Sequence, residues 1–140
     1  MGGALGSAGD LSQFSLALRV MTMPKDTNQY GTIFGGVILS IIDQAGFVQA
    51  RRHGPHRWVT VAMDAVEFKQ PVKLGDVVNA YARTVKSGRS SVTVQVEVHA
   101  ERFNPPGMTV HVTSAQLVMV SVDEQGKAIA FTSPATIRGE

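Results

Sequence analysis

The chain has 140 residues, of which 44% are hydrophobic and 17% charged, and this describes one globular domain with enough apolar surface for a core. The formal net charge of +2 is too small to indicate binding to nucleic acid or to an anionic membrane surface. The absence of cysteine excludes disulfides, thiolate metal ligands and a cysteine nucleophile. We therefore expect a cytosolic protein.

The first ten residues, MGGALGSAGD, lack the basic and long apolar regions of a secretory signal. We expect them to be a flexible leader before a single domain over residues 11–140. The longest apolar stretch, residues 36–50, is interrupted by polar side chains and is shorter than the roughly 20 apolar residues that cross a bilayer. The sequence predicts no membrane span.

The first regular element is a predicted strand at residues 15–21, where apolar and polar residues alternate. After the loop KDTNQYGTIFGG, the sequence VILSIIDQAGFVQARRH shows no alternation over about 17 residues. Its basic end suits the negative pole of a helix dipole, and the Gly-Pro pair that follows stops a helix. We predict one helix that begins at Gly36 and ends near His53.

Four further strands are predicted at residues 58–68, 77–85, 91–100 and 109–122, all with a period of two. The connections between them are short and contain turn formers, which indicates hairpins between consecutive strands and a largely antiparallel sheet. The predicted fold class is α+β, in the order strand, helix, four strands.

The predicted helix is apolar on nearly every side, and such a helix must be covered on all sides. A five-stranded sheet covers one face, but a chain of this length supplies no second layer for the other. We therefore predict an obligate oligomer, in which a partner subunit completes the burial.

Asp43 lies in the middle of this apolar helix, where an ionised carboxylate is costly unless it is paired, neutralised or facing a wet cleft. One interpretation is a general base or nucleophile that lines an active site. The other is a structural carboxylate bound to a backbone amide or an arginine.

Gly35 and Gly36 precede the helix or open it, and free N–H groups at a helix start can polarise a carbonyl or hold an oxyanion. A tight turn is the alternative interpretation. Gly36 and Asp43 are about 10 Å apart along the axis, so one carbonyl cannot touch both. If they cooperate, they belong to different subunits, in agreement with the predicted oligomer.

Three further polar segments are candidates for binding. Asn28 either holds a water or a carbonyl through its amide or is a plain turn residue. The segment RRHGPHR after the helix is basic, but its charges also complete the helix C-terminus. A predicted hairpin turn carries basic and hydroxyl side chains that can bind phosphate. The alternative interpretation is an ordinary solvated β-turn. Its residues are Lys86, Gly88, Arg89, Ser90 and Ser91.

The four histidines lack metal-ligand spacing, so we expect no metal site.

The chain resembles the hotdog-fold acyl-CoA thioesterases, in particular the YciA-like and cytosolic acyl-CoA hydrolase branch. The resemblance runs from about Leu16 to Val122 and rests on N-x-x-G-x-(I/V)-x-G-G, an aspartate on the helix that follows, and P-V-x-x-G-D-x-V. It implies a sheet of about five strands wrapped around one helix. It also implies a double-hotdog dimer, often assembled further into a hexamer.

The resemblance implies hydrolysis of acyl-CoA to a free acid and CoA, with no cofactor besides the CoA of the substrate. The catalytic aspartate matches Asp43, the loop asparagine supplied across the dimer interface matches Asn28, and the helix-start glycines match Gly35 and Gly36. The loop that receives the nucleotide part of CoA matches residues 86–91.

Two other functions are possible on this fold. A hydratase or dehydratase usually requires a histidine paired with an acid near the helix, and the sequence has no such pair there. A non-catalytic acyl-CoA sensor would carry an output module, for which the short leader leaves no room.

Overall fold

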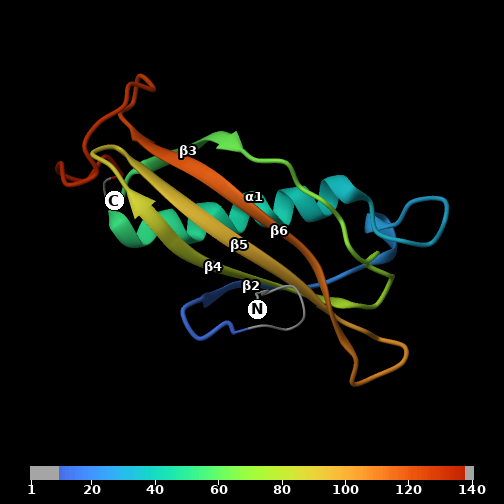
Figure 1. Cartoon of the computed structure of the whole chain (residues 1–140). Helices are drawn as coiled ribbons and strands as arrows, with labels where there is room; N and C mark the ends of the chain where they lie inside the picture. The colour runs from blue at the N-terminus through green and yellow to red at the C-terminus, as the bar shows by residue number, and fades with distance from the viewer. Residues whose placement is uncertain (1–9, 138–140) are drawn as a thin grey trace.

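The computed structural model describes residues 10–137, so the predicted leader lies outside the described part except for Asp10. The strands form one antiparallel sheet in the order β2-β4-β5-β6-β3, and this sheet curls around a single long helix (Figure 1). This confirms the predicted α+β class. The elements are β2 (Ser15–Met21), η1 (Pro24–Asp26), α1 (Gly35–Ala50), η2 (Arg51–His53), β3 (Arg57–Met63), β4 (Val77–Ser87), β5 (Ser91–Glu101) and β6 (Thr109–Val122).

Most predicted boundaries agree with the structure within one or two residues. Strand β2 has the predicted bounds, and β4 and β5 each continue slightly past the predicted end. The helix begins one residue earlier than predicted, and its basic end forms the short 3-10 helix η2. The β4–β5 and β5–β6 connections are the hairpins that the short links predicted.

The predicted hairpin between β3 and β4 is wrong. Strand β3 pairs with β6 at the far edge of the sheet, because both sides of β4 are already occupied by β2 and β5. Residues 64–76, here called the connector, therefore pass from the edge strand β3 to β4, the second strand from the opposite edge, beyond the start of α1 (Figure 1).

The strand predicted to reach residue 68 ends at Met63. A register shift between Thr60 and Ala62 disturbs the ladder, and the carboxylate of Asp64 then accepts the N–H of Gln116 at 2.9 Å. The Asp64 side chain thus accepts the N–H of β6 that a backbone carbonyl would accept in a regular ladder, so the ladder stops there.

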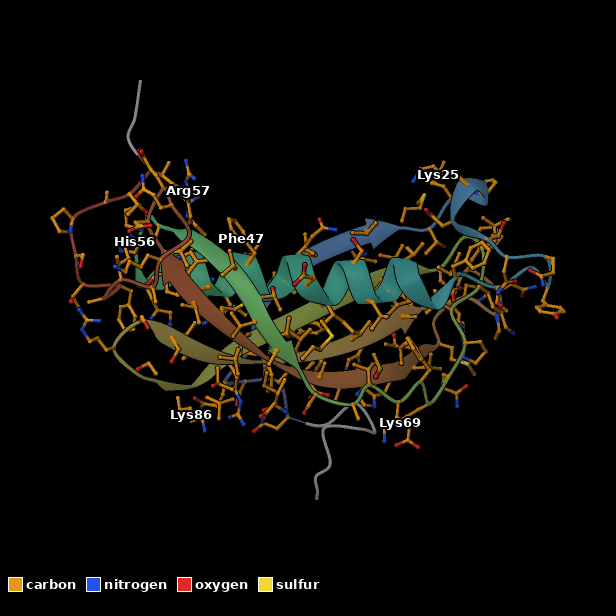
Figure 2. The ribbon with its side chains drawn as sticks, turned by 90° about the horizontal axis from the view of Figure 1, so that it is seen from above. Lys25, Phe47, His56, Arg57, Lys69 and Lys86 are labelled. Atoms are coloured by element: carbon orange, nitrogen blue, oxygen red, sulfur yellow. The ribbon has the colours of Figure 1, made fainter. Side chains whose placement is uncertain are left out.

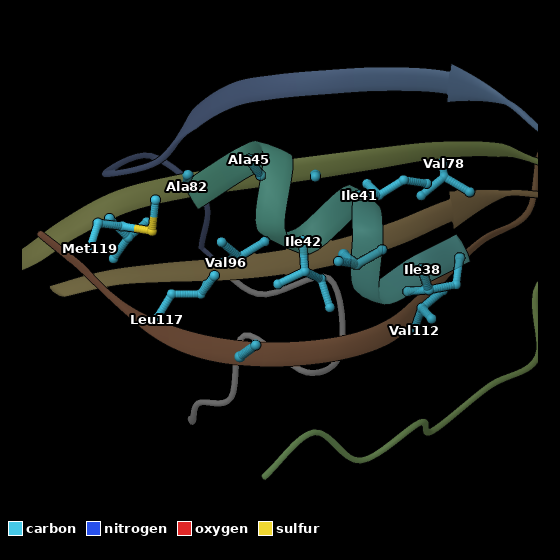
Figure 3. Packing of buried hydrophobic residues seen from close by; sticks show 14 of the residues in the cluster. Ile38, Ile41, Ile42, Ala45, Val78, Ala82, Val96, Val112, Leu117 and Met119 are labelled. Atoms are coloured by element: carbon cyan, nitrogen blue, oxygen red, sulfur yellow. The ribbon is translucent and has the colours of Figure 1, made fainter. Parts of the chain in front are cut away.

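One face of α1 packs onto the concave side of the sheet (Figure 3). Ile38, Ile42 and Ala45 are almost fully buried there, together with the alternate valines of β5. A Cβ on Gly46 would lie 3.1 Å from a methyl carbon of Leu117, so glycine permits the close approach of α1 to β6 at this point.

The opposite face of α1 is open to solvent in the single chain, as expected for a helix that the sheet of one chain covers on one face only. The exposed face carries Ser40, Asp43 and Gln44 beside the apolar Leu39 and Phe47. No helix within residues 10–137 is long and apolar enough to cross a bilayer.

Candidate active site

The start of α1 presents unused backbone donors. Phe34 is the N-cap and makes no side-chain cap, and the first turn contains no acidic residue. The N–H groups of Gly35 and Gly36 have no acceptor within residues 10–137, as expected for the first residues of a helix. A Cβ on Gly36 would meet nothing within 4 Å, so a ligand can approach this backbone closely. The site suits a carbonyl oxygen or an oxyanion.

Asn28 organises the loop that leads into α1. Its carboxamide oxygen accepts the N–H groups of Tyr30 at 2.9 Å and Thr32 at 3.2 Å, and its Nδ2 donates to the Thr32 hydroxyl at 2.9 Å. In the single chain this side chain is therefore engaged as a turn residue, the alternative that the sequence left open. The loop places Asn28 at the same end of the molecule as Gly35.

Asp43 lies on the exposed face of α1 rather than buried, so the desolvation cost expected from the sequence does not arise in the single chain. The Thr60 hydroxyl of β3 donates a 2.5 Å hydrogen bond to Asp43 Oδ1. The other carboxylate oxygen has no partner within residues 10–137, and no arginine or lysine pairs with the group. Such a carboxylate can accept a proton from water or attack an electrophile.

Thr60 is a residue that the sequence analysis did not select. A threonine is ordinary on a β-strand, and only the packing of β3 beside α1 shows that its hydroxyl reaches Asp43. The same hydroxyl also lies 3.2 Å from Met119 Sδ on β6. Thr60 therefore ties the carboxylate to the sheet.

Gly36 and Asp43 are two helical turns apart, which corresponds to about 10 Å along α1. Within one chain, the helix-start donors and the Asp43 carboxylate cannot both touch one thioester carbonyl. The helix-start donors and Asp43 could act on one carbonyl only if they came from different subunits, as the sequence analysis predicted.

The hairpin turn of residues 86–91 lies at the other end of the molecule. Lys86 is near the end of α1 together with His56 and Arg57, whereas Lys25 marks the end where α1 begins (Figure 2). The backbone of the turn is well fixed, since the carbonyls of Arg89 and Ser90 accept N–H groups from residues 131 and 121. The side chains of Lys86 and Arg89 are exposed. Asn28, Gly35 and Gly36 thus lie together, and this basic turn does not join them in one chain.

The histidines belong to the scaffold. His56 is fully buried and its Nε2 lies 2.7 Å from the carbonyl of Phe131. His99 and His111 are cross-strand partners on β5 and β6, and the Glu97 carboxylate contacts His111 Nε2 at 2.9 Å. Burial lowers the pKa of His99, and the nearby His111 lowers it further. Within residues 10–137, no group of three or more His, Cys, Asp or Glu side chains is placed to hold a metal ion.

An apolar cleft of about 220 Å³ lies directly beside the helix start. The connector forms one wall of this cleft, and α1 with the residues just before it forms the other. Its apolar lining consists of Ile33, Gly35, Ile38, Phe68, Pro71 and Val72. An apolar group attached to a carbonyl at the Gly35 amide would enter this cleft.

A family model described as the thioesterase superfamily matches residues 30–102. The acyl-CoA thioester hydrolase YciA of Escherichia coli strain K12 is 39% identical over 124 residues, which is 87% of this chain and 94% of that protein.

Solved structures agree with this relationship. A hexameric hotdog fold thioesterase of Campylobacter jejuni is 44% identical with a TM-score of 0.78, covering 88% of this chain and 92% of that one. A hexameric broad specificity acyl-coenzyme A thioesterase, solved with an aspartate replaced by alanine, is 39% identical with a TM-score of 0.80. That match covers 84% of this chain and 86% of the other.

Proposed function

Since the chain belongs to the thioesterase superfamily and has the hotdog fold, we propose that it hydrolyses acyl-CoA thioesters to a carboxylic acid and coenzyme A. The observation that carries this proposal is the Asp43 carboxylate, which is exposed on α1 and, among residues 10–137, hydrogen-bonded only to Thr60. A carboxylate without a cationic partner is free to act on water or on the substrate.

Asp43 serves the reaction in one of two ways. As a general base it takes a proton from water while the water oxygen attacks the thioester carbon; as a nucleophile it attacks that carbon itself and forms an anhydride, which water then hydrolyses. In both routes the carbon–sulfur bond breaks and the sulfur leaves as a thiolate. The conjugate thiol has a pKa of about 8.5, so no histidine acid is required at the leaving group.

Backbone amides stabilise the charge that develops on the thioester oxygen. The N–H groups of Gly35 and Gly36 have no acceptor in the described part of the chain, and the positive end of the α1 dipole adds to their effect. Asn28 orients the attacking water or the acyl oxygen, provided that its amide exchanges a turn contact for the ligand. The reaction as proposed uses only side chains, amides and water, with no cofactor beyond the CoA of the substrate.

A second copy of the chain completes the site. The exposed face of α1 carries Leu39 and Phe47, and the edge strand β3 exposes Val59 and Val61, so a partner has an apolar surface and a free strand edge to cover. The partner's helix start then comes near the Asp43 of this chain. We propose a homodimer with shared sites, further assembled as a hexamer of three dimers, in a cytosolic protein that binds neither nucleic acid nor membrane.

The basic turn receives the phosphates of CoA. Lys86 and Arg89 supply cations, and the hydroxyls of Ser90 and Ser91 supply further donors. Gly88 keeps the turn tight, since a Cβ there would lie only 3.0 Å from the Ser91 hydroxyl oxygen. Because this turn and the helix start lie at opposite ends of one chain, a shared site is also the arrangement that brings CoA phosphates and thioester to their partners.

The test is a thiol-release assay over a series of acyl-CoA substrates, with the wild type, Asp43→Asn and Asn28→Ala. We expect wild-type turnover, and a loss of at least about 100-fold for Asp43→Asn, in line with the loss of a general base. Comparable turnover by the wild type and Asp43→Asn would reject the role of Asp43. Binding of acyl-CoA without any hydrolysis by the wild type would reject the proposed activity and identify a sensor.

A further inference from the structure

The apolar cleft beside Gly35 has rigid walls. The backbone on either side of Phe68 is fixed to β6, because Lys69 donates its N–H to the Val112 carbonyl at 2.8 Å and the Thr113 hydroxyl donates to the Glu67 carbonyl at 2.7 Å. These bonds hold the connector in place over the helix start, so the cleft is formed before any ligand arrives.

The opposite part of the connector is fixed as well. Ile33 donates its N–H to the Val72 carbonyl at 2.8 Å, and the buried Arg102 donates to the Pro71 carbonyl at 2.8 Å. Arg102 is itself paired with the buried Asp76 at 2.6 Å. The cleft therefore cannot widen by a simple shift of these residues.

The Phe68 ring closes the cleft at its rim. A Cβ built on Gly35 would lie 3.6 Å from the tip of this ring, so the ring reaches from the connector to the helix start. Phe68 is 45% exposed, whereas Ile33 and Ile38 on the other wall belong to the core. Phe68 is thus the wall residue whose size can change without opening the core.

From this geometry we infer that the cleft holds the acyl chain, that it selects straight aliphatic chains of short to medium length, and that Phe68 sets the limit. The inference rests on the proposed function, in which a Gly35 or Gly36 amide holds the thioester oxygen. The carbon chain then enters the cleft beside Gly35, where the Phe68 ring forms one wall. Gln70 is the single polar side chain of the lining, so the cleft favours acyl groups without charge.

The size of the cleft supports a short to medium chain. Its volume of about 220 Å³ is below the roughly 300–1,000 Å³ of pockets that bury drug-sized ligands. A long chain would need the space that the Phe68 ring fills, or part of it would remain in water. Each methylene that fits an apolar pocket changes kcat/KM by about 10-fold or more, so the limit is expected to be visible in kinetics.

The experiment measures kcat/KM for acetyl-, butyryl-, hexanoyl-, octanoyl- and palmitoyl-CoA with the wild type, Phe68→Ala and Phe68→Trp. The matched control is Phe103→Ala, because Phe103 is exposed and packs on Gly75 outside the cleft lining. We expect the wild type to favour hexanoyl- or octanoyl-CoA over palmitoyl-CoA by about 10-fold or more. Phe68→Ala should raise the ratio of palmitoyl to butyryl activity by at least about 10-fold, and Phe68→Trp should lower the activity on octanoyl-CoA relative to butyryl-CoA.

Two results would overturn the inference in distinguishable ways. If the wild type hydrolyses the series but both Phe68 variants keep its chain-length profile, as Phe103→Ala should, the cleft is not the acyl site. If the wild type releases CoA from none of the five thioesters, the proposed function fails and this inference falls with it. Because the two Phe68 variants are expected to shift the profile in opposite directions, failure of one to fold still leaves the other as a test.

Discussion

The Thr60 hydroxyl on the edge strand β3 donates a 2.5 Å hydrogen bond to the Asp43 carboxylate on the exposed face of α1. This bond joins the proposed catalytic group to the part of the sheet that lies at the molecular edge. A partner that covers this edge would therefore meet an aspartate whose position is already fixed. Positioning of this kind matters, because small displacements of a catalytic group lower the rate considerably.

Replacement of Thr60 by valine should lower kcat by about 3-fold to 10-fold, with KM little changed. A hydrogen bond to a charged group is worth about 1.5–3 kcal/mol, and we expect part of that free energy to maintain the carboxylate orientation in the transition state. Valine keeps the shape and strand preference of threonine, and Thr60→Ser is the control that keeps the hydroxyl. Steady-state thiol release distinguishes them: equal kcat for Thr60→Val and Thr60→Ser would contradict the role of the bond.

Replacement of Gly35 by proline should lower kcat by about 100-fold to 1,000-fold if its amide holds the oxyanion. Gly35 is the first residue of α1, where proline is well tolerated, and the preceding Phe34 has a ψ of 136°, which suits the residue before a proline. The substitution therefore removes one N–H and little else. Gly35→Ala keeps the N–H, and its Cβ would meet the Phe68 ring at an ordinary 3.6 Å. Similar rates for these two variants would assign the oxyanion contact to another donor.

His99 should make the protein less stable as the pH falls. Burial and the nearby His111 lower its folded-state pKa below the ordinary value of 6.5, while Glu97 opposes this shift. The unfolded chain then binds the proton at a higher pH than the folded chain, so the free energy of unfolding decreases as the pH falls through 6.5 toward the folded-state pKa. Urea denaturation between about pH 8 and pH 5 should show a steeper loss for the wild type than for His99→Gln. Parallel curves would contradict the predicted linkage.

Two ion pairs in the fold should differ strongly in their effect on stability. Arg102 and Asp76 are buried together, so Arg102→Met leaves an unpaired buried carboxylate. This substitution should lower the free energy of unfolding by about 3–5 kcal/mol. The pair between Arg19 and Glu101 is exposed, and Arg19→Met should leave the unfolding midpoint almost unchanged. Chemical denaturation of both variants checks this contrast. A midpoint for Arg102→Met close to that of Arg19→Met would contradict it.

Much of the fold followed from the sequence because periodicity reports local structure. The alternation in residues 91–100 and the long apolar run after Gly36 identified β5 within one residue and α1 within three. The partner of β3 did not follow, because a short link favours a hairpin unless both edges of the next strand are taken. That condition depends on long-range pairing, which local patterns do not contain.

The sequence identified candidate residues of the site, but it did not predict their exposure or their contacts. Asp43 was selected because a buried charge is costly, yet in the single chain its side chain is exposed. The composition of α1 predicted that the sheet of one chain covers only one face of the helix, and the structure agrees; the polar residues that share the other face with Leu39 and Phe47 were not weighed in that prediction. Nothing in the sequence pointed to Thr60 as a site residue, because its contact with Asp43 arises from the packing of β3 beside α1.

The most direct test of a site shared between two copies is the activity of a mixed oligomer of Asp43→Asn and Gly35→Pro subunits, refolded or co-expressed in equal amounts. If each site takes Asp43 from one copy and the helix start from the other, a mixed pair contains one intact site and one site with both changes. Random pairing then restores about one quarter of the wild-type kcat, far above either variant alone. Activity no higher than the average of the two separate variants would contradict the shared site.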